Sequence, residues 1–122
     1  MRPQVPDGWH NVTCRLVVSE PAKLIAFLRQ AFDAEGDCVT DRPSQLKIGD
    51  SIVMISAEGP RAATRSSFYL YVRDADATFQ RALQAGATAI EQPLDTPYGD
   101  RRAMVSDPFG NDWQIATYRA AL

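Results

Sequence analysis

The stretch from Asp107 to Thr117 reads DPFGNDWQIAT, and it holds the clearest indication of the fold. It is rich in turn formers, because Pro restricts φ while Gly and Asn tolerate a positive φ. The runs on either side, 102–106 and 113–118, have the composition of β-strands, so the stretch predicts a hairpin. In the second run Trp113 begins an apolar face that we expect in the core, whereas Gln114 belongs to a mixed face.

The composition is typical of a globular protein with a single domain, residues 1–122. Hydrophobic residues make up 45% and charged residues 23% of the chain, so a core can form without metal or disulfide crosslinks. Thirteen basic and 15 acidic residues give a formal net charge of −2 without a basic patch, and we expect no nucleic-acid partner. There is no signal-peptide pattern and no apolar run of membrane-spanning length, so we expect no membrane partner and a cytoplasmic location.

The two cysteines, Cys14 and Cys38, are far apart and have neither zinc-binding nor redox spacing. Free cysteines are among the most buried residues of folded proteins. We therefore expect each of them to be a buried free thiol.

The first half of the chain predicts a strand, a helix and three further strands. Apolar residues alternate along 11–19 and then recur at helical spacing from Pro21 to Asp33, where a proline in the first turn favours a helix start. Shorter β-type runs follow at 36–40, 45–48 and 51–56.

The second half repeats this order after a linker at 57–65, which Gly and Pro interrupt. A strand at 67–73 precedes a helix that begins at the N-cap Asp74 and ends before Gly86. The last three predicted strands are 88–92, 102–106 and 113–118.

The two halves align with each other, which indicates an internal duplication of a βαβββ unit. Residues 16–20 correspond to 70–74 at an offset of 54, and residues 53–55 correspond to 113–115 at an offset of 60. The extra residues fall in loops, where insertions are tolerated. The predicted fold is therefore α+β, with curved mixed sheets around a cleft and helices on the outer faces.

This duplication, with modules at 12–56 and 66–118, resembles the vicinal-oxygen-chelate superfamily. The motifs at 72–74, 98–101 and 107–111 strengthen the resemblance, and DPFGNDW is most similar to the PhnB-like and bleomycin-resistance-like branch. Members of the superfamily include glyoxalase I, extradiol dioxygenases and thiol transferases that confer fosfomycin resistance. The resemblance implies a homodimer in which modules of two chains face each other or are exchanged.

The resemblance also implies where a metal would bind. The metal-dependent members carry one ligand on each of four strands, and those places fall here on Thr13, Met54, Ser67 and Gln114. None of these side chains offers an imidazole or an anionic oxygen, which the Lewis-acid chemistry of the superfamily requires. We therefore expect no catalytic metal and no other cofactor.

Other candidate residues come from the same strand faces and from a proline-bordered loop. Arg15, Tyr69 and Tyr71 either contact a ligand in the cleft or are partly buried at an interface. Tyr98 and Arg101 belong to a loop that either closes over a bound anion or forms a solvated turn, with its arginines paired to Asp95 or Asp100.

The leading hypothesis is a protein that binds a small organic molecule in its cleft without a catalytic metal. A second hypothesis is a lyase, isomerase or transferase of the same superfamily that acts on a small carbonyl, phosphonate or thiol substrate. Its base would be His10, Tyr69 or a loop carboxylate such as Glu58, and the catalytic residues stay unassigned. A third is a non-catalytic structural or regulatory dimer.

Overall fold

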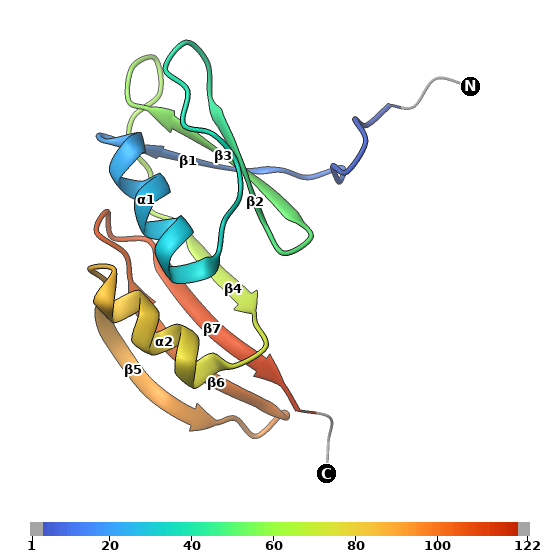
Figure 1. Cartoon of the computed structure of the whole chain (residues 1–122), viewed down its shortest axis with the longest axis vertical. Helices are drawn as coiled ribbons and strands as arrows, with labels where there is room; N and C mark the ends of the chain where they lie inside the picture. Colours follow the sequence, from blue (N-terminus) through green and yellow to red (C-terminus); the bar gives the residue numbers. More distant parts are fainter. Residues whose placement is uncertain (1–3, 120–122) are drawn as a thin grey trace.

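The described part of the chain folds into two open mixed β-sheets that are accompanied by two helices (Figure 1). The computed structural model describes residues 4–119. Within that range the first half of the chain forms β1 (Cys14–Val18), α1 (Pro21–Phe32), β2 (Ser44–Ile48) and β3 (Ser51–Ala57). The second half forms β4 (Ser67–Tyr71), α2 (Ala75–Gln84), β5 (Thr88–Asp95), β6 (Asp100–Ser106) and β7 (Asp112–Tyr118).

The strand pairing confirms the tandem modules. The first sheet has the order β1-β3-β2 and the second has the order β4-β7-β6-β5, with β1 parallel to β3 and β4 parallel to β7. Arg15 pairs with Met54 in the first sheet, and Tyr69 pairs with Gln114 in the second. These two pairs are equivalent at the offsets of 54 and 60 seen in the sequence, so the duplication extends to the register of the strands.

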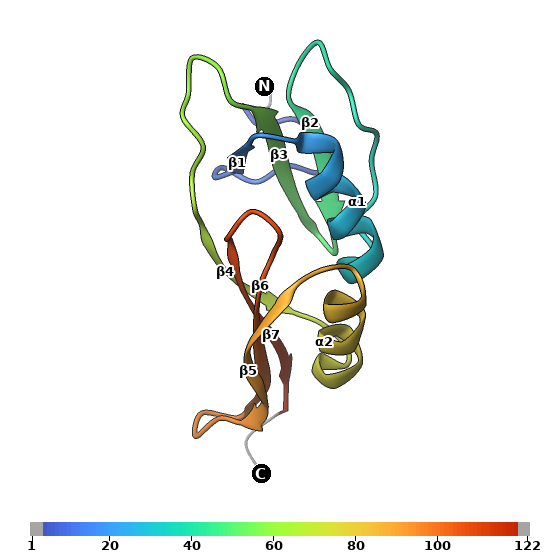
Figure 2. The same cartoon turned by 90° about the vertical axis from the view of Figure 1, so that its left-hand side faces the viewer.

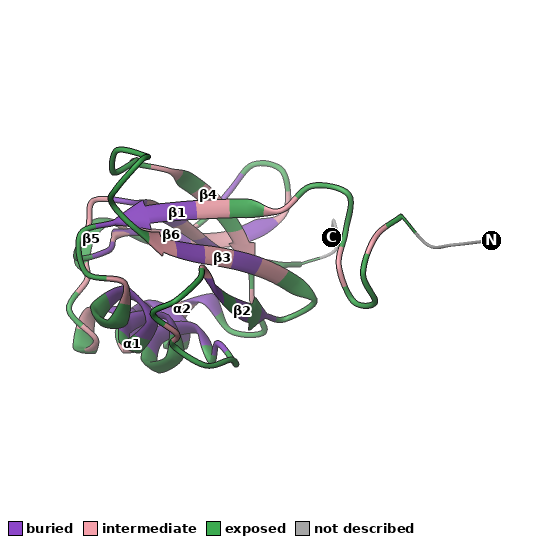
Figure 3. Cartoon of the chain, turned by 90° about the horizontal axis from the view of Figure 1, so that it is seen from above, coloured by how far each residue is buried: buried purple, intermediate pink, exposed green. Residues whose placement is uncertain are grey.

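Both helices lie on the same side of the strands (Figures 2 and 3). The two sheets follow one another along the long axis of the molecule, and α1 is stacked on α2 (Figure 1). The helices start as predicted, since Pro21 opens α1 and the Asp74 side chain accepts a hydrogen bond from the Ala77 N–H group at 3.1 Å. This arrangement leaves the other face of each sheet without a covering helix.

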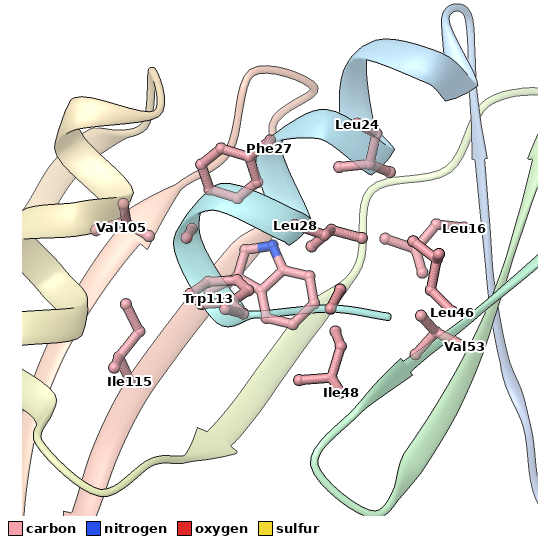
Figure 4. Packing of buried hydrophobic residues seen from close by; sticks show 14 of the residues in the cluster. Leu16, Leu24, Phe27, Leu28, Leu46, Ile48, Val53, Val105, Trp113 and Ile115 are labelled. Carbon is pink, nitrogen blue, oxygen red and sulfur yellow. The ribbon is translucent and has the colours of Figure 1, made fainter. Parts of the chain in front are cut away.

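One hydrophobic core joins the two modules, and Trp113 lies at its centre (Figure 4). The indole of Trp113 stacks on Phe68 with 4.3 Å between ring centroids, and it also meets Phe32 of α1 at 4.9 Å. Trp113 is 2% exposed, which confirms the prediction that it faces the core. Because Phe32 belongs to the first module and Trp113 to the second, this contact ties the modules together.

The turn between β6 and β7 is organised by the buried carboxylate of Asp107. Its Oδ1 accepts hydrogen bonds from the N–H groups of Phe109 at 2.8 Å and Asn111 at 3.0 Å. Its Oδ2 accepts from the Asn111 amide at 2.9 Å and from the Trp113 indole N–H at 3.0 Å. The side-chain Oδ1 of Asn111 in turn accepts the N–H of Ser66 at 2.9 Å, so the turn also fixes the residue before β4.

The predicted strand at 36–40 is wrong, because this segment forms no strand and the first sheet has three strands within the described residues. The Ser44 hydroxyl accepts the Val39 N–H at 2.9 Å and donates to the Val39 carbonyl at 3.3 Å. A side chain thus takes the backbone groups that a strand partner would have used. Only the preceding Glu35 forms a bridge, with Lys47 of β2.

The prediction that both cysteines are buried is also wrong, since Cys14 and Cys38 are exposed free thiols. Cys14 stands at the first position of β1 and lines a pocket, and burial along the strand begins only at Leu16. Cys38 lies in the segment that forms no strand, so no neighbouring strand covers it.

The long loop expected after residue 92 is shorter in the structure. β5 continues through Pro93 to Asp95, with register shifts against β6 between residues 89 and 94 that accommodate the proline. Because β6 then begins at Asp100, only residues 96–99 form the turn.

Candidate functional site

The open face of the second sheet carries a cluster of tyrosines around one buried carboxylate. Tyr69 and Tyr71 come from β4, Tyr98 from the turn before β6, and Asp100 from the first position of β6. The Asp100 Oδ2 accepts hydrogen bonds from the hydroxyls of Tyr69 at 2.6 Å and Tyr71 at 3.0 Å. We refer to Tyr69, Tyr71, Tyr98 and Asp100 as the tyrosine cluster.

A second interaction extends the tyrosine cluster toward the edge of the sheet. The hydroxyls of Tyr69 and Tyr98 lie 3.3 Å apart, and Arg102 Nη1 donates to the Tyr98 hydroxyl at 2.8 Å. Arg102 is itself held by Glu91 of β5, whose Oε1 accepts from Nε at 3.0 Å and from Nη2 at 2.9 Å. The positive charge of Arg102 is thus balanced by Glu91, and no described basic group forms a salt bridge with Asp100.

Local structure explains why Asp100 points into the tyrosine cluster. Thr96 fixes the turn, because its hydroxyl accepts the Asp100 N–H at 2.9 Å and donates to the Asp100 carbonyl at 3.1 Å. Side chains alternate along a strand, so Asp100 and Arg102 share the open face while Ala103 and Val105 do not. Asp100 is 3% exposed, whereas Tyr69, Tyr71 and Tyr98 are 38%, 57% and 60% exposed.

The carboxylate keeps the phenols protonated. Burial, followed by the hydrogen bond to Asp100, raises the pKa of Tyr69 far above its ordinary value. The hydrogen bond to Asp100 is the main cause that raises the pKa of Tyr71. Both side chains therefore act as hydrogen-bond donors at neutral pH, which argues against the hypothesis that Tyr69 serves as a base.

Arg101 lies apart from the tyrosine cluster. Its Nε and Nη2 donate to the two carboxylate oxygens of Asp76 in α2, each at 3.0 Å, and Nη1 reaches Asp95 at 3.4 Å. The hydrogen bond from Arg101 lowers the pKa of Asp76. Arg101 thus joins β6 to the start of α2, and the predicted pairing with Asp95 is present.

The four positions at which the resemblance predicts metal ligands carry side chains that do not fit a metal. Met54 has Arg15 beside it, with Nη2 3.9 Å from Sδ, so a cationic group occupies the vicinity of the sulfur. Gln114 pairs with Tyr69 in the second sheet, and Thr13 precedes β1 in the first. These neutral side chains, with Ser67, offer no imidazole or anionic donor, and no group of three or more His, Cys, Asp or Glu residues within 4–119 could hold a metal ion.

A small pocket of about 210 Å³ lies where the two sheets meet. Its lining includes Thr13 and Tyr69 among the predicted candidates, together with His10 and Cys14. The sequence did not place His10 near any nucleophile, because His10 lies outside the regular elements. Glu58, the third proposed base, is exposed in the segment after β3.

A larger pocket of about 950 Å³ lies at the far end of the first module. It is bordered by the first residues of α1, by the segment 38–43 and by residues 60–61, and Arg15 is the predicted candidate that reaches it. The candidates of the second sheet take no part in it. The described residues also form no helix that is long and apolar enough to span a membrane.

Sequence reasoning missed Asp100, Arg102 and Glu91 as members of the site. The expected start of β6 at Arg102 left Asp100 in a loop, where alternation gives no information about its direction. A start at Asp100 would have placed it on the same face as Arg102.

Two tandem modules with open mixed sheets define a glyoxalase-type fold. The crystal structure of TioX from Micromonospora sp. ML1 superposes with a TM-score of 0.75 at 22% identity, covering 89% of this chain and 98% of TioX. The fosfomycin resistance protein FosX from Mesorhizobium loti gives 0.69 at 22% identity, covering 91% of this chain and 93% of FosX. These likenesses establish the fold.

The sequence profile of the Glyoxalase/Bleomycin resistance protein/Dioxygenase superfamily matches residues 10–115. An uncharacterized protein of Mycobacterium bovis is 34% identical over 121 residues, a match that covers 82% of this chain and 78% of the relative. The chain belongs to the Glyoxalase/Bleomycin resistance protein/Dioxygenase superfamily.

Proposed function

We propose that this protein binds a small organic molecule on the open face of its second sheet, without a catalytic metal. The observation that carries the proposal is the tyrosine cluster, in which three large aromatic side chains stay exposed on one sheet face around an ordered carboxylate. Exposed aromatic groups with fixed polar partners are typical of binding sites, because rings supply contact area and polar groups supply orientation. Gln114, beside Tyr69, adds an amide to the same face.

We further propose that the protein works as a homodimer in the cytoplasm, in the bleomycin-resistance-like and PhnB-like part of its superfamily. Binding sites bury most of a ligand's surface, and a single open sheet face cannot do so alone. A second copy would supply the opposite wall. Two exposed free thiols are compatible with a reducing compartment.

The direct test is a thermal-shift screen of aromatic ligands in the presence of a chelator, followed by calorimetry on variants. We expect Tyr69→Ala to weaken binding of the hits roughly tenfold, since it removes one ring wall. Arg61→Ala is the matched control, because Arg61 lines the large pocket of the first module. If Arg61→Ala weakens binding of the hits and Tyr69→Ala does not, the ligand binds in that pocket and the proposed site is wrong.

A second candidate function is an enzyme of the same superfamily that acts on a small carbonyl, phosphonate or thiol substrate. It is favoured by the shared pocket that His10, Cys14 and Tyr69 line at the junction of the sheets. If His10 activates the thiol, iodoacetamide will alkylate Cys14 more slowly in a His10→Gln variant, while Cys38 reacts at an unchanged rate. Equal rates for Cys14 in both proteins would remove the support for this candidate.

A further inference from the structure

The tyrosine cluster carries an unbalanced negative charge beneath a set of aromatic rings. The neighbouring charges of Arg102 and Glu91 cancel each other at 2.9 Å, and Arg101 is engaged by Asp76 away from the cluster. The Asp100 carboxylate has only phenol partners at its Oδ2. A neutral phenol leaves the full charge of the carboxylate in place, so the cluster is electrostatically negative.

The aromatic rings of the tyrosine cluster also favour a positively charged ligand. An aromatic ring has a negative face. A phenol that donates a hydrogen bond to a carboxylate also gains electron density in its ring. The centroids of Tyr69 and Tyr71 lie 5.3 Å apart with their planes tilted by 54°, so the rings do not cover each other in a flat stack. Tyr71 and Tyr98 are more than half exposed, which leaves ring surface accessible to a ligand.

Burial of the carboxylate selects among cations. Asp100 is 3% exposed and its Oδ2 is occupied by two hydroxyl donors, so a small ammonium ion gains little direct contact with it. A bulky alkylated ammonium needs no hydrogen-bond acceptor, because it interacts with ring faces and with the long-range field of the charge. The site therefore matches an organic cation better than a free amine or a metal ion.

We propose that the tyrosine cluster binds the alkylated ammonium group of an organic cation, with Tyr71 and Tyr98 as ring walls and Asp100 as the fixed counter-charge. This inference rests on the proposed function, because it names the ligand class of the same face. It also assigns separate roles to its members. Tyr71 acts through its ring, whereas Asp100 acts through its charge and by holding the hydroxyls of Tyr69 and Tyr71.

The test compares choline with 3,3-dimethyl-1-butanol, its uncharged carbon analogue, by NMR titration of the full-length protein at constant ionic strength. We expect choline to shift the ring signals of Tyr71 and Tyr98 and to bind roughly tenfold tighter than the alcohol. Equal binding of the two probes would overturn the proposal, and so would choline-induced shifts confined to other parts of the chain.

Variants distinguish the contribution of the Tyr71 ring from that of the Asp100 charge. Tyr71→Phe should keep choline binding within about threefold, whereas Tyr71→Leu should reduce it to roughly the level of the uncharged probe. Asp100→Asn should abolish the preference for choline over the alcohol, and circular dichroism will show whether that variant is folded. Because Tyr71 is exposed, its two variants should fold and test the proposal even if Asp100→Asn does not fold. Choline binding that survives Tyr71→Leu contradicts the proposal.

The same titrations separate this inference from the proposed function. If neutral aromatic ligands shift the signals of Tyr69 and Gln114 while choline does not, the face binds small molecules and the cation assignment is wrong. If neither class of ligand shifts them, both proposals are wrong.

Discussion

At the scale of single residues, the make-up of the site depends on which face of β6 each charged side chain occupies. Asp100 and Arg102 lie on the open face of β6, and Arg101 between them reaches α2. A shift of one residue exchanges the two faces of a strand completely. The sequence identified Tyr69 and Tyr71 as candidates from their alternation on β4, and Tyr98 from its place in the proline-bordered loop. It could not identify Asp100, because the start of β6 is set by the Thr96 hydrogen bonds rather than by any apolar pattern.

The tyrosine cluster makes a testable prediction about pH. The pKa values of Tyr69 and Tyr71 are raised in the folded state above the unfolded value of about 10. Their contribution to the free energy of unfolding is therefore complete below about pH 10, and it is lost as the pH rises toward the folded-state pKa. In an ultraviolet titration, the Asp100→Asn variant should ionise more tyrosines near pH 10 than the wild type.

The control for this titration is Glu91→Gln, which changes a charge near the tyrosine cluster and leaves the Asp100 hydrogen bonds in place. If the wild type and Asp100→Asn titrate identically, Asp100 does not hold the phenols protonated, and the electrostatic account of the site fails.

At the scale of elements, the turn at residues 107–111 positions two strands at once. Asp107 holds the Trp113 indole and Asn111, and Asn111 holds the residue before β4. The sequence predicted the turn from its Pro and Gly residues. The role of the carboxylate was not predictable, because Asp favours turns through local hydrogen bonds whether or not its side chain is buried.

We expect Asp107→Ala to lower the free energy of unfolding by about 3 kcal/mol, because it leaves the buried indole N–H and the Asn111 amide without an acceptor. Urea denaturation provides the measurement. Asp112→Ala at the first position of β7 is the control, and we expect its effect to stay below about 0.5 kcal/mol, since no side-chain hydrogen bond of Asp112 is formed within the described residues. Equal costs for the two variants would contradict this role of Asp107.

The connection between β6 and α2 gives a second prediction at this scale. Arg101→Gln removes the ion pair with Asp76, whose carboxylate is half exposed, so we expect only a small loss of stability at pH 7. The lowered pKa of Asp76 means that this stabilisation is present above the unfolded value of about 3.9 and is lost as the pH falls. Urea unfolding of both proteins should therefore show a difference at pH 7 that shrinks below pH 4, and a difference that grows in acid would refute the assignment.

The missing strand at 36–40 shows a limit of sequence patterns at the same scale. The segment has β-type residues, yet the Ser44 hydroxyl satisfies the backbone of Val39 within the chain itself. A local bond between a side chain and the backbone replaces pairing between strands, and no alternation of apolar residues reveals it.

At the scale of the whole molecule, the duplication was predictable from the sequence, because equivalent strand pairs keep their offsets, although the first sheet has three strands and the second has four. That the two modules share one hydrophobic core was harder to predict from the sequence. It depends on the contact of Phe32 with Trp113, which joins residues far apart in the chain and leaves no periodic trace.

This contact predicts that the modules unfold together. Phe32→Ala should lower the free energy of unfolding by about 3–5 kcal/mol and keep a single transition, because it opens a cavity in a shared core. Urea unfolding followed by Trp fluorescence and by circular dichroism provides the measurement. Wild-type transitions that differ between the two probes would show instead that the modules are independent.

The proposed homodimer is also a property of the whole molecule. Sedimentation equilibrium should give a mass near twice the 13.5 kDa of the chain, since the face of each sheet opposite the helices is otherwise left open to solvent. A mass of one chain at all concentrations would contradict the homodimer and would leave the ligand site with a single wall.

The central claim is that the open face of the second sheet binds a small organic molecule without a metal. The most direct measurement is an amide NMR titration of the labelled protein in a chelating buffer, with the strongest ligand from the screen. The account predicts shifts at Tyr69, Tyr71 and Gln114 that saturate without added metal. Shifts confined to residues 38–43 and 60–61, or shifts that appear only after Zn²⁺ is supplied, would contradict it.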